Sequence, residues 1–187
     1  MTAALGRAAA LLPEAADVFV LRATLARLRN DGRAAVEAAQ SALLVDPASP
    51  EAHAEMGRVR LARGESSAAR TEIETALRRR PTDWRVMVSA VRLSVAERVF
   101  DEAADRLVQA ERAGAPAGSV AAERGRLWLA IGRTGEAATA LAQAIQSSPR
   151  DVDLRVALGD ALSANHSLAQ AAGAVPAPRR RASAAAF

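Results

Sequence analysis

The sequence contains no cysteine, no lysine and no tyrosine, and only 3% of its 187 residues are aromatic. Without cysteine, the chain can form neither disulfides nor thiolate metal sites. Half of the residues are hydrophobic, but much of this content is alanine, which buries little surface per side chain. Stability therefore has to come from close helix contacts that are repeated many times, and this favours a helical array over a β-sandwich or barrel.

Long apolar runs are also missing, since none approaches the roughly 20 residues that cross a bilayer. Arg7 interrupts the segment 3–12 and Pro13 ends it, so this segment lacks the continuous apolar region of a signal peptide. We therefore expect a cytoplasmic chain without a membrane span; a periplasmic location stays open if the natural protein begins upstream of Met1. The use of arginine without any lysine and the abundant alanine are typical of proteins from a GC-rich bacterial genome.

The patterns of common catalytic and metal sites are absent from the sequence. His53 and His166 lie far apart, and neither belongs to an HExxH or similar ligand spacing. There is no GxSxG motif and no glycine-rich phosphate loop. The acids Asp101, Glu102 and Asp105 are clustered, but they open a predicted helix, where negative charge is favourable for structural reasons. We predict that the chain is not an enzyme and that it binds no cofactor or metal.

What the sequence does contain is a repeat with a period of 34 residues, which indicates stacked helical units. Its positions are Ala35, Ala69, Ala103 and Ala137; Ala42, Ala76, Ala110 and Ala144; Gly57, Gly125 and Gly159; and Pro13, Pro47, Pro81 and Pro149. In the third unit Val91 replaces the glycine, and Pro116 is displaced by one residue.

The apolar residues of the second half of each unit have helical spacing. Ala69, Ile73 and Ala76 recur at intervals of three and four, which places them on one face of an α-helix. Small residues on this face let a neighbouring helix approach closely, and the larger residue fills the gap. Gly57 and Gly125 are predicted to allow the same close approach on the first helices. No segment alternates with a period of two, so we predict no strand.

Residues typical of helix ends mark the unit boundaries. The predicted N-caps of the later first helices are Ser49, Asp83, Ser119 and Asp151. Pro50 suits the first turn of its helix. The turns inside the units are predicted to hold residues with positive φ at Asn30, Gly64 and Gly132. Arg98 has the same place in the third unit, where we expect a strained or different turn.

The stretches MGRVRLARGESSAARTEIETALRRRP and RGRLWLAIGRTGEAATALAQAIQSSP resemble the tetratricopeptide repeat family, whose 34-residue unit consists of two antiparallel helices. The resemblance implies an all-α fold, a right-handed superhelical solenoid of antiparallel helix pairs, with protein or peptide partners. The family's large aromatic residue of the first helix is kept only as Trp128. Ala26, Arg60 and Ser94 replace it elsewhere, so we expect looser packing there.

The repeat divides the chain into one solenoid, 1–172, and a tail. The solenoid comprises a half unit at 1–15, units at 16–49, 50–83, 84–117 and 118–151, and a partial unit at 152–172. The half unit matches a second helix, and the partial unit matches a first helix with a short piece of a second. The tail 173–187 has proline, arginine and alanine without periodicity, so we predict that it is disordered.

Arginines with the repeat period mark the surface that the first helices present on the concave side of such solenoids. Glu55 precedes Arg58 by three residues and Glu123 precedes Arg126 by three, whereas Arg92 has only Ser89 there. We therefore expect Arg92 to be the least neutralised and to matter most for binding. The predicted partner-binding residues are Arg58, Arg92, Arg126, Arg85 and Arg27. The simpler alternative is a set of ordinary solvated arginines.

From these residues we predict a protein-interaction scaffold. It would bind an extended or helical segment of a partner, preferably an acidic one, in its concave groove. The alternative is an accessory arm of a larger enzyme or secretion protein, namely a glycosyltransferase, a sulfotransferase or a polysaccharide-export protein. The lysines that the resemblance implies for binding a chaperone C-terminus are missing at Val20, Ala54 and Val88. Specific nucleic-acid binding through the arginine runs 78–80 and 179–181 is disfavoured, since stacking aromatics are scarce.

Overall fold

A computed structural model describes residues 15–174, with side chains for 15–167. Every regular element in this range is an α-helix, which confirms the all-α prediction. The helices are α2 (Ala16–Leu28), α3 (Gly32–Val45), α4 (Pro50–Ala62), α5 (Ser66–Arg79), α6 (Trp84–Ala96), α7 (Phe100–Arg112), α8 (Ala117–Ala130), α9 (Thr134–Ser147) and α10 (Val152–Ala174).

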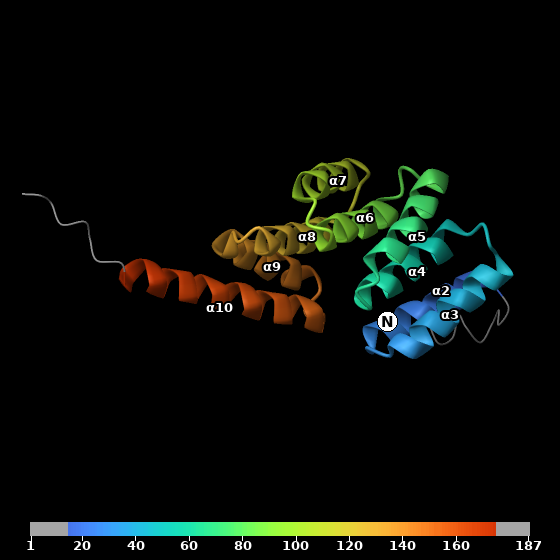
Figure 1. The fold of residues 1–187 in the computed structure, drawn as a ribbon, viewed down its shortest axis with the longest axis horizontal. Coiled ribbons are helices and arrows are strands. Elements are labelled where there is room, and N and C mark those ends of the chain that lie inside the picture. The colour runs from blue at the N-terminus through green and yellow to red at the C-terminus, as the bar shows by residue number, and fades with distance from the viewer. Residues whose placement is uncertain (1–14, 175–187) are drawn as a thin grey trace, which may run out of the picture.

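The helices form an elongated array of antiparallel pairs, with α2 and α3 at one end and α10 at the other (Figure 1). Each first helix contacts the next first helix, from α2 through α4, α6 and α8 to α10. Among the described residues, the second helices α3, α5, α7 and α9 make no such contacts with one another. Successive first helices therefore lie closer together than successive second helices, and the array is concave on the side of the first helices.

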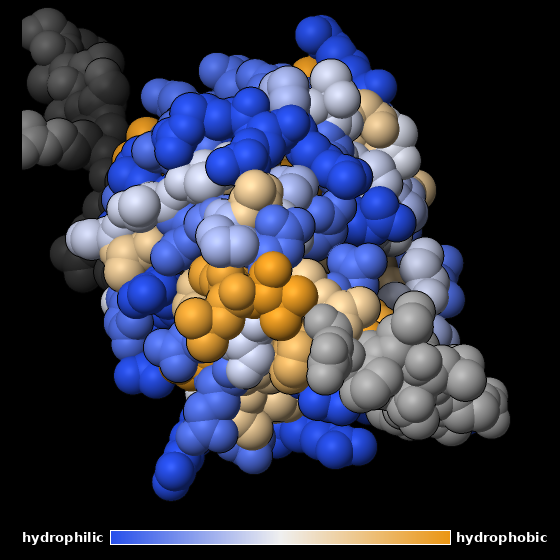
Figure 2. All heavy atoms as spheres, turned by 90° about the vertical axis from the view of Figure 1, so that its right-hand side faces the viewer, coloured by the Kyte–Doolittle hydropathy of each residue, from blue (hydrophilic) through white to orange (hydrophobic). Residues whose placement is uncertain are grey.

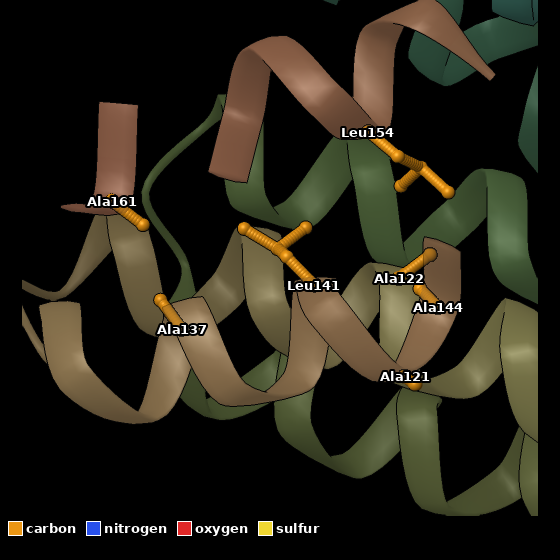
Figure 3. Packing of buried hydrophobic residues seen from close by; sticks show 7 residues of the cluster. All are labelled: Ala121, Ala122, Ala137, Leu141, Ala144, Leu154 and Ala161. Atoms are coloured by element: carbon orange, nitrogen blue, oxygen red, sulfur yellow. The ribbon is translucent and has the colours of Figure 1, made fainter. Parts of the chain in front are cut away.

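Small residues and one larger residue form the core between the helices of a unit, as the spacing predicts. A Cβ atom added at Gly57 would lie 2.5 Å from Cγ1 of Ile73, and one at Gly125 would lie 2.6 Å from Cγ of Leu141. Both glycines are thus needed for the close approach of the two helices. Figure 3 shows how Leu141 packs between alanines of α8, α9 and α10 at the C-terminal end of the array.

Two of the three positions that lack the aromatic residue, Arg60 and Ser94, make polar contacts. The Ser94 hydroxyl is buried and lies 3.3 Å from Oε2 of Glu102 on α7. Nη1 of Arg60 donates to Oε2 of Glu65 at 3.3 Å, across the turn that leads to α5. Hydrogen bonds therefore connect the two helices where other units of this type use an aromatic ring.

The turns inside the four units have one shape. Asn30, Gly64, Arg98 and Gly132 all have positive φ, between 59° and 85°. The amide of the residue that follows each of them donates to the carbonyl of Ala26, Arg60, Ser94 and Trp128, respectively. This is the hydrogen bond of the Schellman motif, which satisfies a free carbonyl at a helix end. Of the two predicted outcomes at Arg98, the turn therefore keeps the shape of the other three, and Arg98 has a strained conformation with φ 62°.

Most predicted helix starts are confirmed, but one is wrong. Ser49, Asp83 and Asp151 accept backbone hydrogen bonds as N-caps from Ala52, Arg85 and Leu154. Ser119 is not an N-cap, because α8 already begins at Ala117 after Pro116. The reason is the preceding turn: Gly114 has φ +84° and the amide of Ala115 donates to the carbonyl of Ala110, which ends α7 one residue early in the repeat.

The last helix differs from the predicted partial unit. α10 continues without a break from Val152 to Ala174, so no short piece of a second helix follows a turn within it. His166 occupies the place of Asn30, Gly64, Arg98 and Gly132, but the chain stays helical there. The predicted half unit at 1–15, apart from residue 15, and the tail segment 175–187 lie outside the described residues.

Figure 2 shows the end of the array that lies on the right of Figure 1; this face is largely hydrophilic, with a compact hydrophobic group near its centre. None of the described helices is both long enough and apolar enough to span a membrane.

Candidate partner-binding groove

A groove of about 740 Å³ runs along the first helices. Four of the five predicted residues line it, namely Arg27, Arg58, Arg92 and Arg126. Arg85 is not among the lining residues; it is exposed, with its guanidinium 4.7 Å from the centre of the Trp84 ring. Stacking of the first helices therefore brings arginines of α2, α4, α6 and α8 to one surface, although only Arg58, Arg92 and Arg126 have the 34-residue register.

In the N-terminal half of the groove, two arginines share one buried carboxylate. The side chain of Glu55 is fully buried, and its Oε1 accepts a hydrogen bond from Nε of Arg27 at 2.9 Å. Its Oε2 accepts from Nη1 of Arg58. A buried carboxylate is costly unless it is paired, so both arginines are held in place by the need of Glu55 for donors.

The C-terminal half repeats this arrangement around Glu123, whose side chain is 2% exposed. Oε1 of Glu123 accepts from Nε of Arg92 at 2.7 Å and from Nη1 of Arg126 at 2.9 Å. Oε2 of the same carboxylate is buried and has no hydrogen-bond partner within the described part of the chain. Both oxygens are thus withdrawn from solvent behind the arginine side chains.

The expectation that Arg92 is the least neutralised arginine is wrong. The sequence analysis considered only partners on the same helix, whereas Glu123 comes from the next first helix, 31 residues later. The charge of Glu123 has the largest effect on Arg92 and raises the pKa of its guanidinium, and Asp151 and Asp153 act in the same direction. Arg92 is therefore well compensated.

Arg58 is in the opposite situation. Its Nε donates to the neutral Ser89 hydroxyl at 2.8 Å, at the position where Arg92 finds Glu123. Burial, opposed by the attraction of Glu55, lowers the pKa of the Arg58 guanidinium, and the charges of Arg27 and Arg92 lower it further. The two halves of the groove therefore differ in charge compensation, because Arg58 meets the hydroxyl of Ser89 where Arg92 meets the carboxylate of Glu123.

Residues without the repeat period complete the groove. Arg29 and Asp153 line it, together with the exposed apolar side chains of Leu28 and Val152. They were missed in the sequence analysis because none of these four residues has the register of Arg58, Arg92 and Arg126. Including these residues, the N-terminal half of the groove is lined by Arg27, Arg29 and Arg58, of which Arg27 and Arg58 pair with Glu55. In the C-terminal half, Arg92 and Arg126 are lining residues together with two acids, Glu123 and Asp153.

The other residues that were considered for chemistry have structural contacts. Nδ1 of His53 lies 2.7 Å from Oε2 of Glu72, and its Nε2 lies 3.1 Å from the Pro47 carbonyl. In the described range, no cluster of histidines and acids is suited to hold a metal ion. The hydrogen bond from Arg106 is the main cause that lowers the pKa of Glu102.

The arginine run 78–80 lies at the end of α5, where cations are favourable. Arg80 pairs with Glu51 at 3.0 Å, and Nη2 of Arg78 donates to the Thr75 hydroxyl at 2.8 Å. Arg78 and Arg80 of this run therefore contact residues of the array itself. The run 179–181 lies outside the described residues.

Solved structures with the same fold are tetratricopeptide-repeat proteins. A thermophilic TPR protein of Thermus thermophilus superposes with a TM-score of 0.66 at 20% identity, over 84% of this chain and 87% of that one. PilW, a type IV pilus biogenesis factor, superposes with a TM-score of 0.60 at 20% identity, over 95% and 86%. A TPR protein of Parabacteroides merdae superposes with a TM-score of 0.60 at 16% identity, over 90% and 67%.

At the level of sequence, no protein-family model matches the chain and no curated protein is similar to it. The structural likeness nevertheless covers most of the chain and of two of these three proteins. The chain therefore has the tetratricopeptide-repeat fold, as the 34-residue period predicts.

Proposed function

We propose that this chain, with its tetratricopeptide-repeat fold, is a protein-interaction scaffold that holds an extended or helical segment of a partner along its first helices. The observation that carries this proposal is the groove, in which arginines from four consecutive first helices line one surface. Such a surface is built by the stacking of units, and none of the units forms it alone. Arg27, Arg58, Arg92 and Arg126 are its contact residues.

The buried glutamates support binding because they hold the arginines in place. Glu55 and Glu123 each take hydrogen bonds from two arginines, so the guanidinium groups lose little conformational freedom when a ligand arrives. Guanidinium groups offer several donors, and those not used by the glutamates remain for carboxylates of a partner. The preferred ligand is therefore a segment with acidic residues.

The N-terminal half of the groove is the stronger site for negative charge. Arg27 and Arg58 share Glu55 there and Arg29 adds a further positive charge to the groove lining, whereas acids compensate Arg92 and Arg126. Leu28 supplies an exposed apolar contact beside these arginines. We place acidic residues of the partner against Arg29 and Arg58, with an apolar residue on Leu28.

The test is affinity for an acidic peptide selected against the protein, with Arg29→Glu as the variant. Arg29 is exposed at the end of α2 and has no ion pair among the described residues, so the fold tolerates the change. Arg112→Glu is the matched control, since Arg112 is exposed at the end of α7, away from the groove. We expect about fivefold weaker binding for Arg29→Glu, no change for Arg112→Glu, and weaker binding of the parent at higher salt.

The proposal for the groove is overturned if Arg29→Glu binds like the parent while Arg112→Glu loses affinity. It also fails if exchange-protection mapping places the peptide on α3, α5, α7 or α9, because these helices do not line the groove between Arg27 and Arg126.

The accessory arm of a larger enzyme or secretion protein is a second candidate. It is favoured by α10, whose apolar Val156 and Leu162 are exposed and offer a surface to a further domain. The DNA that flanks the coding region tests this candidate: an open frame that continues into a catalytic or export domain supports it, and stop codons on both sides contradict it.

A further inference from the structure

Within the described residues, α10 is not followed by a second helix as α4 and α8 are. Gly57 of α4 and Gly125 of α8 face Ile73 and Leu141, each on the second helix of its own unit. Gly159 has the same register in α10, but no described atom lies within 4 Å of a Cβ built there. The notch that receives a large side chain in two units is therefore open at the end of the array.

Apolar residues flank this notch on the same face of α10. Val156 and Leu162 are 58% and 53% exposed, three residues before and after Gly159. One repeat earlier, Ala122 and Gly125 are buried at the places of Val156 and Gly159. The other face of α10 is already packed, since Leu154 and Ala161 are buried against α9 (Figure 3).

The sequence after α10 does not supply the missing helix. Val175 has the register of Leu141, 34 residues later, but Pro176 and Pro178 follow directly. Proline in a helix interior removes a hydrogen bond and clashes with the preceding turn. Position 175 is therefore not followed by the sequence pattern of a second helix.

The first twelve residues do have the pattern of a second helix. Leu5 has the register of Ile73 and Leu141, and Ala8 has that of Ala76 and Ala144. The segment contains no proline before Pro13, which stands where a proline ends the second helix in other units. In the same molecule this segment precedes α2, which lies at the opposite end of the array from α10 (Figure 1).

We propose that residues 1–12 of a second copy dock on α10 as the missing second helix, with Leu5 in the notch at Gly159. The contact joins residues 1–12 of one copy, the head, to α10 of another copy, here called the tail end. It is therefore heterologous and leaves one free head and one free tail end in every assembly. Copies then associate into linear chains whose length grows with concentration. This proposal uses neither the groove arginines nor their ligand, and it stands or falls separately from the function proposed above.

The test is sedimentation velocity on the full chain and on two variants that each block one end. Leu5→Glu places a charge on the head, and Gly159→Arg fills the notch of the tail end. Gly159→Arg is compatible with the fold, because the space at Gly159 is open and arginine is a better helix former than glycine. Leu44→Glu is the control, since Leu44 is 83% exposed on α3 and belongs neither to residues 1–12 nor to α10.

We expect the parent and Leu44→Glu to form larger species as their concentration rises, and each blocked variant to sediment as a monomer. An equimolar mixture of Leu5→Glu and Gly159→Arg then has to give dimers and nothing larger, because only one intact head and one intact tail end remain. Circular dichroism checks that all variants keep the helical content of the parent.

Three outcomes overturn the proposal. They are a parent that stays monomeric over the whole concentration range, blocked variants that associate like the parent, and a mixture that remains monomeric although both variants are folded. Association that Leu44→Glu abolishes places the contact on α3 and contradicts the proposal as well.

Discussion

Gly125 and Gly159 stand at the same position of the repeat, but their surroundings are opposite. A Cβ atom built at Gly125 would lie 2.6 Å from Cγ of Leu141 on α9, whereas one built at Gly159 of α10 would meet no described atom within 4 Å. The two helices differ in one respect that matters here: α8 is followed by a second helix and α10 is not, within the described residues. A repeat position thus specifies a surface for a partner helix, and it becomes a packed core only where that partner is present.

The groove arginines show the same dependence on the neighbouring element. Arg58 and Arg92 are one repeat apart, but the next first helix offers Ser89 to the former and Glu123 to the latter. Equal positions therefore have unequal electrostatic environments. In both cases the element that follows decides what a repeat position does.

The largest effect is expected from truncating a large side chain beside each of the two glycines: Leu141 at the filled notch and Leu162 at the open one. Leu141 is fully buried, so Leu141→Ala is expected to lower the free energy of unfolding by about 3 kcal/mol, from lost burial and a cavity. Leu162 is half exposed on α10, so Leu162→Ala is expected to lower the free energy of unfolding by less than about 0.5 kcal/mol. Urea denaturation at a concentration where the chain is monomeric measures both; similar losses would show that α10 is covered.

A smaller effect is expected from adding one methyl group at the filled notch. The new Cβ in Gly125→Ala would lie 2.6 Å from Cγ of Leu141 and 3.3 Å from the Ala137 carbonyl oxygen, so α8 and α9 have to move apart. Against the better helix propensity of alanine, we expect a net loss of about 1 to 2 kcal/mol in the free energy of unfolding. A thermal midpoint equal to that of the parent would contradict this close approach.

The same substitution at the open notch is expected to have the opposite sign. Gly159→Ala meets no described atom within 4 Å, so only the helix propensity changes, and the free energy of unfolding rises by about 0.5 to 1 kcal/mol. Urea denaturation of dilute protein is the measurement. A destabilised Gly159→Ala monomer would mean that a segment of the same molecule already fills the notch.

Much of the fold was predictable because local physics determines it. The spacing of Ala69, Ile73 and Ala76 predicts the buried face of α5, and all three are fully buried. The turn at Gly64 and the N-cap at Ser49 depend on residues within a few positions of them. Such features are encoded by the short stretch of sequence that forms them.

The errors concern contacts between elements that are far apart in the sequence or turns with competing endings. Ser119 is a good N-cap by type, but the Schellman hydrogen bond of Ala115 shifts the start of α8 to Ala117. The compensation of Arg92 by Glu123 spans 31 residues and two helices, so spacing along one helix did not reveal it. Whether the groove arginines bind a partner stays a prediction.

The sequence by itself determined the period, the helix pairs and the tetratricopeptide-repeat fold, because helix spacing, caps and small residues act over one or two turns. Only the tertiary structure decided which charges pair across the groove and which apolar face stays open. The physical reason is that Coulomb attraction and burial depend on distance in space. The distance between Arg92 and Glu123, or the empty notch at Gly159, follows from how whole units stack.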